Sequence, residues 1–103
     1  MIIITGTVVV SPENRMAFLD AARRQVMASR AEAGCISYHC AEDAFAPGSF
    51  IFVEKWRDAE AMQVHFARSY SVEFAHAARR LAANSPVIEI HEVAGVRTLN
   101  PSG

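Results

Sequence analysis

The 103-residue chain has little excess charge of either sign, no long apolar run and only two cysteines. A formal net charge of −1 gives nucleic acid or an anionic membrane no electrostatic reason to bind. The opening apolar run at residues 2–4 is far too short to span a bilayer, and no basic leader or small-residue cleavage site accompanies it. We therefore expect a soluble, cytoplasmic protein with neither nucleic acid nor membrane as a partner.

The two cysteines, Cys35 and Cys40, are five residues apart on one expected strand. An odd spacing places their side chains on opposite faces, where they cannot bond to each other. The spacing is not that of zinc ligands either. The sequence predicts two buried reduced thiols and no metal site, with a redox pair as the weaker alternative.

A chain of this length predicts one domain over residues 1–103, with an ordered core over about 1–97 and a C-terminal tail at 98–103. The hydrophobic share of 51% is high for so small a protein, whose own core is thin. Some of the apolar surface is therefore expected to face a partner chain.

The first half of the chain predicts a strand, a helix and a hairpin. The β-branched run 2–10 predicts a strand, and Ser11 with Pro12 predicts the helix start. Gly34 is expected to end that helix in a left-handed cap. Strands at 35–42 and 49–56 are joined by a turn at Pro47-Gly48. Helical spacing gives the first helix an inner face made of Met16, Leu19, Ala22, Arg23, Val26 and Met27.

The second half predicts a second helical region and a final strand. Asp58 is expected to cap a helix that restarts at Ser69 or Ser71 and stops before Pro86. Its inward residues are Met62, His65, Phe66, Tyr70, Phe74, Ala77, Ala78 and Leu81. Residues 87–97 predict the last strand, with a bulge at Gly95.

The resulting βαββαβ order is that of an α+β, ferredoxin-like fold, a four-stranded antiparallel sheet with both helices on one face. The opposite face of the sheet would carry too many apolar side chains to remain in water. We therefore expect a homodimer in which two sheets pair face to face.

Several short patterns at these spacings resemble the antibiotic biosynthesis monooxygenase family, which includes quinol monooxygenases. They are EAGC at 32–35, Tyr38, FVEKWRD at 52–58, Ala61, and the His-Phe pair at 65–66. The resemblance implies a dimeric α+β barrel with a pocket between sheet and helices in each subunit. It also implies oxidation of phenolic or quinol-like substrates by O₂ without flavin, haem or metal.

The chain departs from the family pattern at one position. Members often carry a second histidine shortly after the first, where this sequence reads Arg68-Ser69-Tyr70, so that Tyr70 is left to supply a hydroxyl. Haem-degrading relatives use an Asn on the first strand and a His late in the second helical region. The first strand has no Asn, and His76 is offset from the apolar stripe, which disfavours that activity.

His65 is the candidate catalytic base, because a cofactor-free oxygenase must deprotonate its substrate and imidazole titrates near neutral pH. The alternative, a purely structural histidine bonded to a neighbour, is equally compatible with the sequence. Glu54, between two aromatic residues on one strand face, requires a partner, for which Arg23 is a candidate. The expected substrate-binding residues are Tyr38, Phe52, Trp56, Met62, Phe66 and Tyr70.

These observations predict a cofactor-independent monooxygenase that oxidises a small quinol or polyphenolic aromatic substrate with O₂. Two alternatives remain open at this point. One is a non-catalytic dimeric module that binds a small ligand or serves a structural role. The other is an isomerase of a small oxygenated metabolite, which needs the same base but no oxygen.

Overall fold

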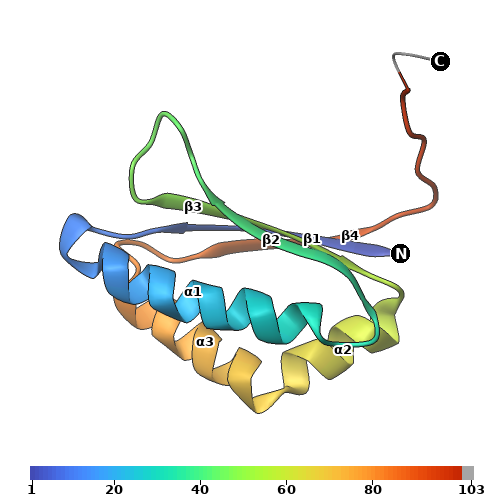
Figure 1. The fold of residues 1–103 in the computed structure, drawn as a ribbon, viewed down its shortest axis with the longest axis horizontal. Helices are drawn as coiled ribbons and strands as arrows, with labels where there is room; N and C mark the ends of the chain where they lie inside the picture. The colour runs from blue at the N-terminus through green and yellow to red at the C-terminus, as the bar shows by residue number, and fades with distance from the viewer. Residues whose placement is uncertain (101–103) are drawn as a thin grey trace.

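A sheet and a layer of helices make up the molecule (Figure 1). The structure, a computed structural model, describes residues 1–100. The strands are β1 (Ile2–Val9), β2 (Cys35–Glu42), β3 (Ser49–Trp56) and β4 (Val87–Glu92). The helices are α1 (Arg15–Arg30), α2 (Ala59–Ala67) and α3 (Ser69–Leu81), with a 3-10 turn, η1 (Pro12–Asn14), before α1.

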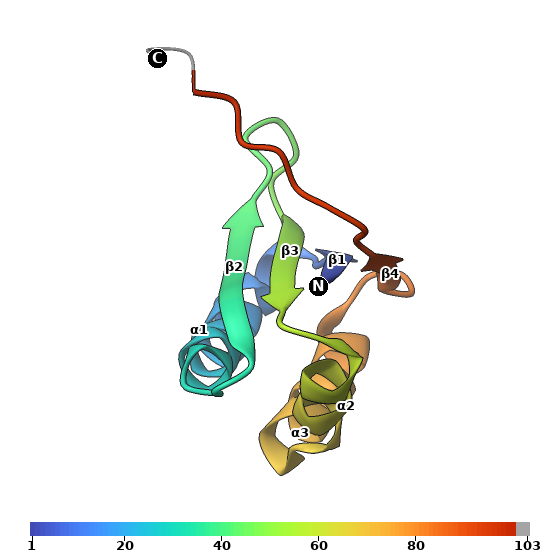
Figure 2. The same cartoon turned by 90° about the vertical axis from the view of Figure 1, so that its right-hand side faces the viewer.

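The sheet is antiparallel throughout, in the order β2-β3-β1-β4. All the helices lie on one of its faces and leave the other face uncovered (Figure 2). This arrangement confirms the predicted ferredoxin-like α+β fold. No helix within residues 1–100 is long and apolar enough to cross a membrane.

The alternation along β3 holds as the sequence predicts, because successive side chains of a strand point to opposite faces. Phe50, Phe52, Glu54 and Trp56 are buried beneath the helices, whereas Ile51, Val53 and Lys55 face the uncovered side. Phe18 of α1 packs on Phe50 with ring centroids 4.9 Å apart and anchors the helix layer to the sheet.

The predicted inner face of α1 is partly wrong. Met16 and Met27 are exposed, and Arg23 pairs with Asp20 in solvent. The buried residues are Phe18, Ala21, Ala22, Gln25 and Ser29. Small side chains let the helix approach the other elements closely, and Gln25 and Ser29 can be buried because each makes a hydrogen bond.

The prediction that Cys35 and Cys40 face opposite sides is also wrong. A bulge between Cys35 and Ser37 shifts the register of β2 and leaves Ile36 exposed. Both thiols consequently pack against the same core, half-buried and free.

Gly34 does not cap α1, which ends four residues earlier, and it has no positive φ. Its role is steric, since a Cβ at this position would lie 2.3 Å from the Cβ of Ala61 in α2. The turn at Pro47-Gly48 forms as predicted, with Gly48 at φ 86°.

Asp58 caps α2 by accepting a 2.8 Å hydrogen bond from the Ala61 amide, and α3 restarts at Ser69, both as predicted. The last strand ends at Glu92 rather than at residue 97, so Gly95 lies outside it. Just beyond β4 the Val93 amide donates a 3.0 Å hydrogen bond to the Met1 carbonyl, and the chain then runs away from the sheet (Figure 1). The rest of the predicted tail, residues 101–103, is outside the described residues.

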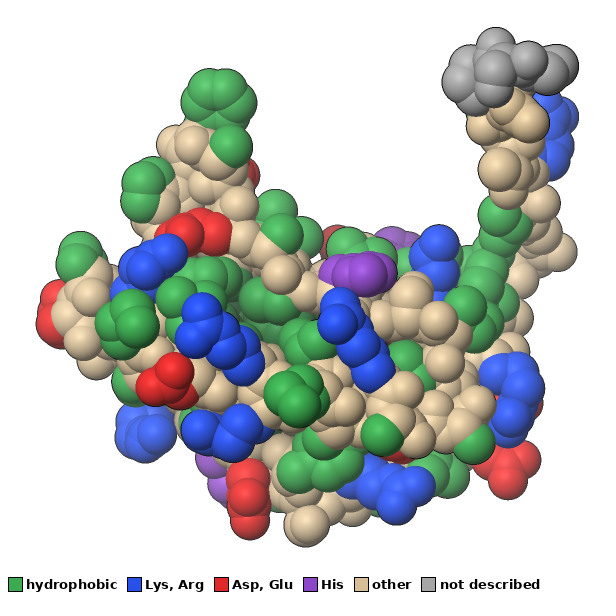
Figure 3. Space-filling model, in the orientation of Figure 1, with side chains coloured by type: hydrophobic (Ala, Val, Ile, Leu, Met, Phe, Trp, Pro, Cys, Tyr) green, Lys and Arg blue, Asp and Glu red, His purple; other side chains and the backbone are tan. Residues whose placement is uncertain are grey.

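Positively charged, negatively charged and apolar side chains are interspersed on the α1 side of the molecule (Figure 3). The loop between β2 and β3 projects from the body, and Phe45 within it is 96% exposed. The surface of this side therefore carries no continuous patch of one sign.

Candidate functional site

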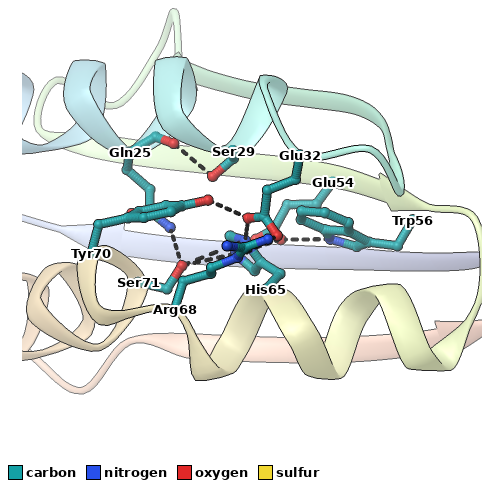
Figure 4. A network of polar contacts seen from close by, with 9 residues as sticks. All are labelled: Gln25, Ser29, Glu32, Glu54, Trp56, His65, Arg68, Tyr70 and Ser71. Atoms are coloured by element: carbon teal, nitrogen blue, oxygen red, sulfur yellow. Dashed lines mark hydrogen bonds and ion pairs between the residues drawn. The ribbon is translucent and has the colours of Figure 1, made fainter.

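His65 occupies the buried face of α2, between the helix layer and the sheet. Asp58 sets the start of the helix, and Ala61 and His65 then fall one turn apart on its buried side. The imidazole is 2% exposed and lies against the indole of Trp56, with ring centroids 4.3 Å apart. The residues around it lie on α1, the α1–β2 loop, β3, α2 and α3 (Figure 4).

A carboxylate holds one side of the imidazole. His65 Nδ1 is 2.7 Å from Glu32 Oε2, and the Tyr70 hydroxyl donates to the same oxygen. Arg68 Nε lies 3.4 Å from the other oxygen, Oε1. Burial alone would raise the pKa of Glu32, but these hydrogen bonds and the charges of His65 and Arg68 outweigh it and hold the pKa below its ordinary value. Glu32 is therefore ionised at neutral pH.

The ionised partner fixes the tautomer of His65. A carboxylate only accepts hydrogen bonds, so Nδ1 carries the proton and Nε2 carries the lone pair. Burial lowers the pKa of His65, and the hydrogen bond and charge of Glu32 offset only part of this effect. The ring is consequently neutral at pH 7, with Nε2 available as a base.

A second carboxyl group lies on the Nε2 side. Glu54 Oε1 is 3.8 Å from His65 Nε2 and accepts a 3.0 Å hydrogen bond from Trp56 Nε1. Burial raises the pKa of Glu54 to about 7, although hydrogen bonds from Trp56 and Tyr38 oppose the shift. The prediction that Arg23 pairs with Glu54 is wrong, because the Arg23 side chain is 68% exposed and pairs with Asp20.

A short polar chain continues from His65 toward α1. Ser71 Oγ lies 3.4 Å from both ring nitrogens of His65 and accepts a 3.2 Å hydrogen bond from Gln25 Nε2. Ser29 Oγ donates to the backbone oxygen of Gln25 at 2.6 Å and completes the chain. The imidazole is thus surrounded by fixed polar groups.

These groups border a cavity of about 120 Å³ between the sheet and the helices. Four of the residues predicted from the sequence line it: Tyr38, Phe52, His65 and Phe66. The other lining side chains are mostly apolar, which suits a small aromatic ligand. The polar ones that sequence reasoning did not assign to a pocket are Gln25, Glu54, Ser71 and Arg79.

Three predicted pocket residues lie elsewhere. Trp56 is fully buried behind the imidazole, and Met62 packs against the core beside it. Tyr70 lines a groove between α1 and α3 and reaches His65 only through Glu32. None of the three lines the cavity.

Two of the missed residues carry a signal in the sequence. Gln25 lies between Ala22 and Ser29 at helical spacing, and Ser71 lies three residues before Phe74 on the inward stripe of α3. A polar residue within an apolar stripe is expected to be buried with a partner. Glu32 has no such signal, because it lies in the loop after α1.

No group of three or more His, Cys, Asp or Glu side chains within residues 1–100 is placed to hold a metal ion. The functional candidates are the imidazole, its two flanking carboxyl groups and the cavity. The buried carboxylate–imidazole pair lies beside a mostly apolar cavity. Such a pair can accept and return a proton, as an acid–base site requires.

The chain belongs to the antibiotic biosynthesis monooxygenase family, whose model matches residues 1–78. The Synechocystis protein sll1783 is 35% identical over 98 residues, which span 95% of this chain and 67% of that protein. The Bacillus subtilis protein named "Putative monooxygenase YcnE" is 38% identical over 65 residues, which span 63% of this chain and 68% of that protein.

The fold agrees with solved structures. A crystal structure from Deinococcus radiodurans, described as a "putative antibiotic biosynthesis monooxygenase", superposes with a TM-score of 0.91 at 27% identity. The superposition covers 97% of this chain and 99% of that one. A monooxygenase-like family and its fold are thereby established for the chain.

Proposed function

We propose that the protein is a cofactor-independent monooxygenase that oxidises a small quinol or polyphenolic aromatic substrate with O₂. One observation carries this proposal. His65 is held by Glu32 so that its unprotonated Nε2 lies beside a cavity with mostly apolar walls. A neutral buried imidazole of this kind is suited to take the proton of a phenolic hydroxyl.

The reaction is balanced without a further reductant, because the substrate supplies the electrons. His65 Nε2 accepts the hydroxyl proton, and the more electron-rich phenolate gives electrons to O₂. One oxygen atom then bonds to a ring carbon and the other leaves as water. A quinol and O₂ thus yield a hydroxyquinone and H₂O, and the imidazolium returns its proton to the departing oxygen.

The cavity supports the positions of substrate and base. Phe52 and Phe66 offer ring faces or edges to an aromatic substrate, and Tyr38 adds a hydroxyl from β2. The Glu32 carboxylate would stabilise the imidazolium once it forms, since that carboxylate is 2.7 Å from Nδ1.

The test measures O₂ uptake with a panel of quinols and polyphenols, with no added metal or flavin. His65→Gln is expected to lower kcat by at least about 100-fold, the usual contribution of a general base. The matched control is His76→Gln, because His76 is exposed on α3, and it is expected to retain full activity.

Turnover that survives His65→Gln unchanged would contradict the role of His65. Ligand binding without O₂ uptake would instead identify a non-catalytic binding module. Product formed equally well under argon would identify an isomerase.

We also propose that the protein works as a homodimer through the uncovered face of the sheet. Ile3, Ile51, Val53 and Val87 lie on this face, where no helix covers them. Apolar side chains gathered on one uncovered face are typical of a protein–protein interface. Sedimentation is expected to give a dimer for the native chain and a monomer for Val53→Arg. Val64→Arg, at an exposed apolar position on α2, is expected to remain dimeric, and a native chain that sediments as a monomer would refute the proposal.

A further inference from the structure

One buried acceptor in the site has no partner. Gln25 is 4% exposed, and its Nε2 donates to Ser71 Oγ at 3.2 Å. Its Oε1 is buried and accepts no hydrogen bond from any residue within 1–100. Buried acceptors in folded proteins are nearly always satisfied, so an unpaired one beside a cavity points to a ligand.

The Gln25 amide donates through Nε2 to Ser71 Oγ, which leaves one amide acceptor, Oε1, unpaired. The unmet requirement at this point is therefore for a hydrogen-bond donor.

Gln25 and His65 both line the same cavity. Ser71 lies between them, 3.2 Å from Gln25 Nε2 and 3.4 Å from the His65 ring nitrogens. Because both residues border the cavity, a ligand in it can meet two unpaired acceptors, Gln25 Oε1 and His65 Nε2. A ligand that satisfies both must carry two donors.

The volume of the cavity limits the size of that ligand. It measures about 120 Å³. An apolar cavity of about 150 Å³ holds one benzene molecule. The cavity consequently has room for one aromatic ring.

We propose that Gln25 is a substrate-positioning residue whose Oε1 accepts a hydrogen bond from the second hydroxyl of a single-ring aromatic diol. The first hydroxyl of that diol lies at His65 Nε2. This inference rests on the proposed function for the role of His65, and it adds the residue that orients the ring and the number of rings. A diol held at both ends presents its reacting hydroxyl to the base in one orientation.

The first experiment compares three ligands of similar size, hydroquinone, 4-fluorophenol and 1,4-difluorobenzene, with the native protein under argon. They carry two, one and no hydroxyl donors. Affinity is expected to fall about tenfold with each hydroxyl lost, as for removal of one hydrogen bond to a buried group. Equal affinity for all three, or no binding by any, would overturn the proposal.

The second experiment locates the contact. The chain has two glutamines, Gln25 and Gln63, and Gln63 is exposed on α2. The Gln63→Met variant therefore leaves one pair of glutamine side-chain amide signals in a ¹⁵N–¹H spectrum, which belongs to Gln25. These signals are expected to shift on addition of hydroquinone and to move much less with 4-fluorophenol. Signals that do not respond to hydroquinone would refute the contact, and this measurement does not depend on a variant at Gln25.

The third experiment removes the acceptor. Gln25→Met keeps the length of the side chain and is expected to weaken hydroquinone binding about tenfold while leaving 1,4-difluorobenzene binding unchanged. Gln63→Met is the matched control and is expected to change neither affinity. Equal loss for both ligands in Gln25→Met would show a packing defect rather than a lost hydrogen bond.

These binding measurements separate the inference from the proposed function. If Gln25 discriminates among the ligands but no quinol consumes O₂, the site positions a diol without oxidising it. If quinols are oxidised while binding ignores the second hydroxyl, the proposed function holds and the inference about Gln25 is wrong.

Discussion

The two sides of the His65 ring carry the same functional group in different surroundings. The Glu32 and Glu54 side chains are 8% and 9% exposed, respectively. Their pKa values nevertheless move in opposite directions, below the ordinary value for Glu32 and up to about 7 for Glu54. Exposed area alone therefore does not decide the charge of a buried carboxyl group.

The difference lies in what surrounds each carboxyl group. Glu32 sits near the surface and receives a hydroxyl, an imidazole N–H and a guanidinium charge. Glu54 sits in the middle of the sheet, where burial raises its pKa and the nearby negative charge of Glu32 adds to the shift. One carboxylate stays charged and orients the ring, while the other exchanges a proton near neutral pH.

The largest expected effect comes from Glu54→Gln. A carboxyl group whose pKa rises from 4.5 to about 7 on folding costs stability as the pH rises from 4.5 to 7, because only the unfolded chain ionises there. The variant should match the native protein at pH 4 and exceed its free energy of unfolding by about 3 kcal/mol at pH 8. Urea unfolding across this pH range checks the prediction, with the exposed Glu89→Gln as control.

Glu32→Gln should change the free energy of unfolding in the opposite direction. Since the pKa of Glu32 is lowered on folding, its contribution is present above the ordinary pKa and is lost as the pH falls below it. The variant should lose about 2 kcal/mol of unfolding free energy at pH 7, through weaker hydrogen bonds from His65 and Tyr70 and the lost ion pair. Urea unfolding over the same pH range checks this prediction. A Glu32→Gln variant more stable than the native protein at pH 7 would contradict the opposite effects assigned to Glu32 and Glu54.

Tyr70→Phe should have the smallest effect. It removes one hydroxyl that donates to Glu32 and is expected to cost about 1 kcal/mol of unfolding free energy. It should also shift the pKa of His65, followed by NMR of the ring protons, because Glu32 would lose one of its hydrogen bonds. Arg68→Ala serves as comparison and should cost about 0.5 kcal/mol, since Arg68 is half exposed and screened by water.

The parts of the fold that follow from local patterns could be predicted. The alternation in β3, the cap at Asp58 and the turn at Gly48 each depend on residues close in sequence. The inner face of α1 was predicted less well, because long apolar side chains such as Met27 resemble core residues whether or not a neighbour covers them. The bulge in β2 has no local signal and moved a cysteine to the other face.

The candidate site also has parts that local sequence patterns predict and parts that they do not. His65 and its burial follow from the helical spacing of α2. Its partner Glu32 is 33 residues away, in a loop whose position depends on how α1 and α2 pack, so no periodicity could join the two. The strand pattern correctly places Trp56 on the buried face of β3. It cannot show that His65 lies between Trp56 and the cavity, so Trp56 is not the pocket wall that the sequence predicts.

Gly34 gives the molecule an unusual mutational sensitivity. It follows Glu32 by two residues and lies where a methyl group would meet Ala61, one turn before His65 on α2. The missing side chain thus sets how closely the α1–β2 loop approaches α2, and with it the 2.7 Å separation between carboxylate and imidazole. A substitution as small as alanine at position 34 is therefore expected to disturb the candidate site, although it changes no ionisable group and no residue that lines the cavity.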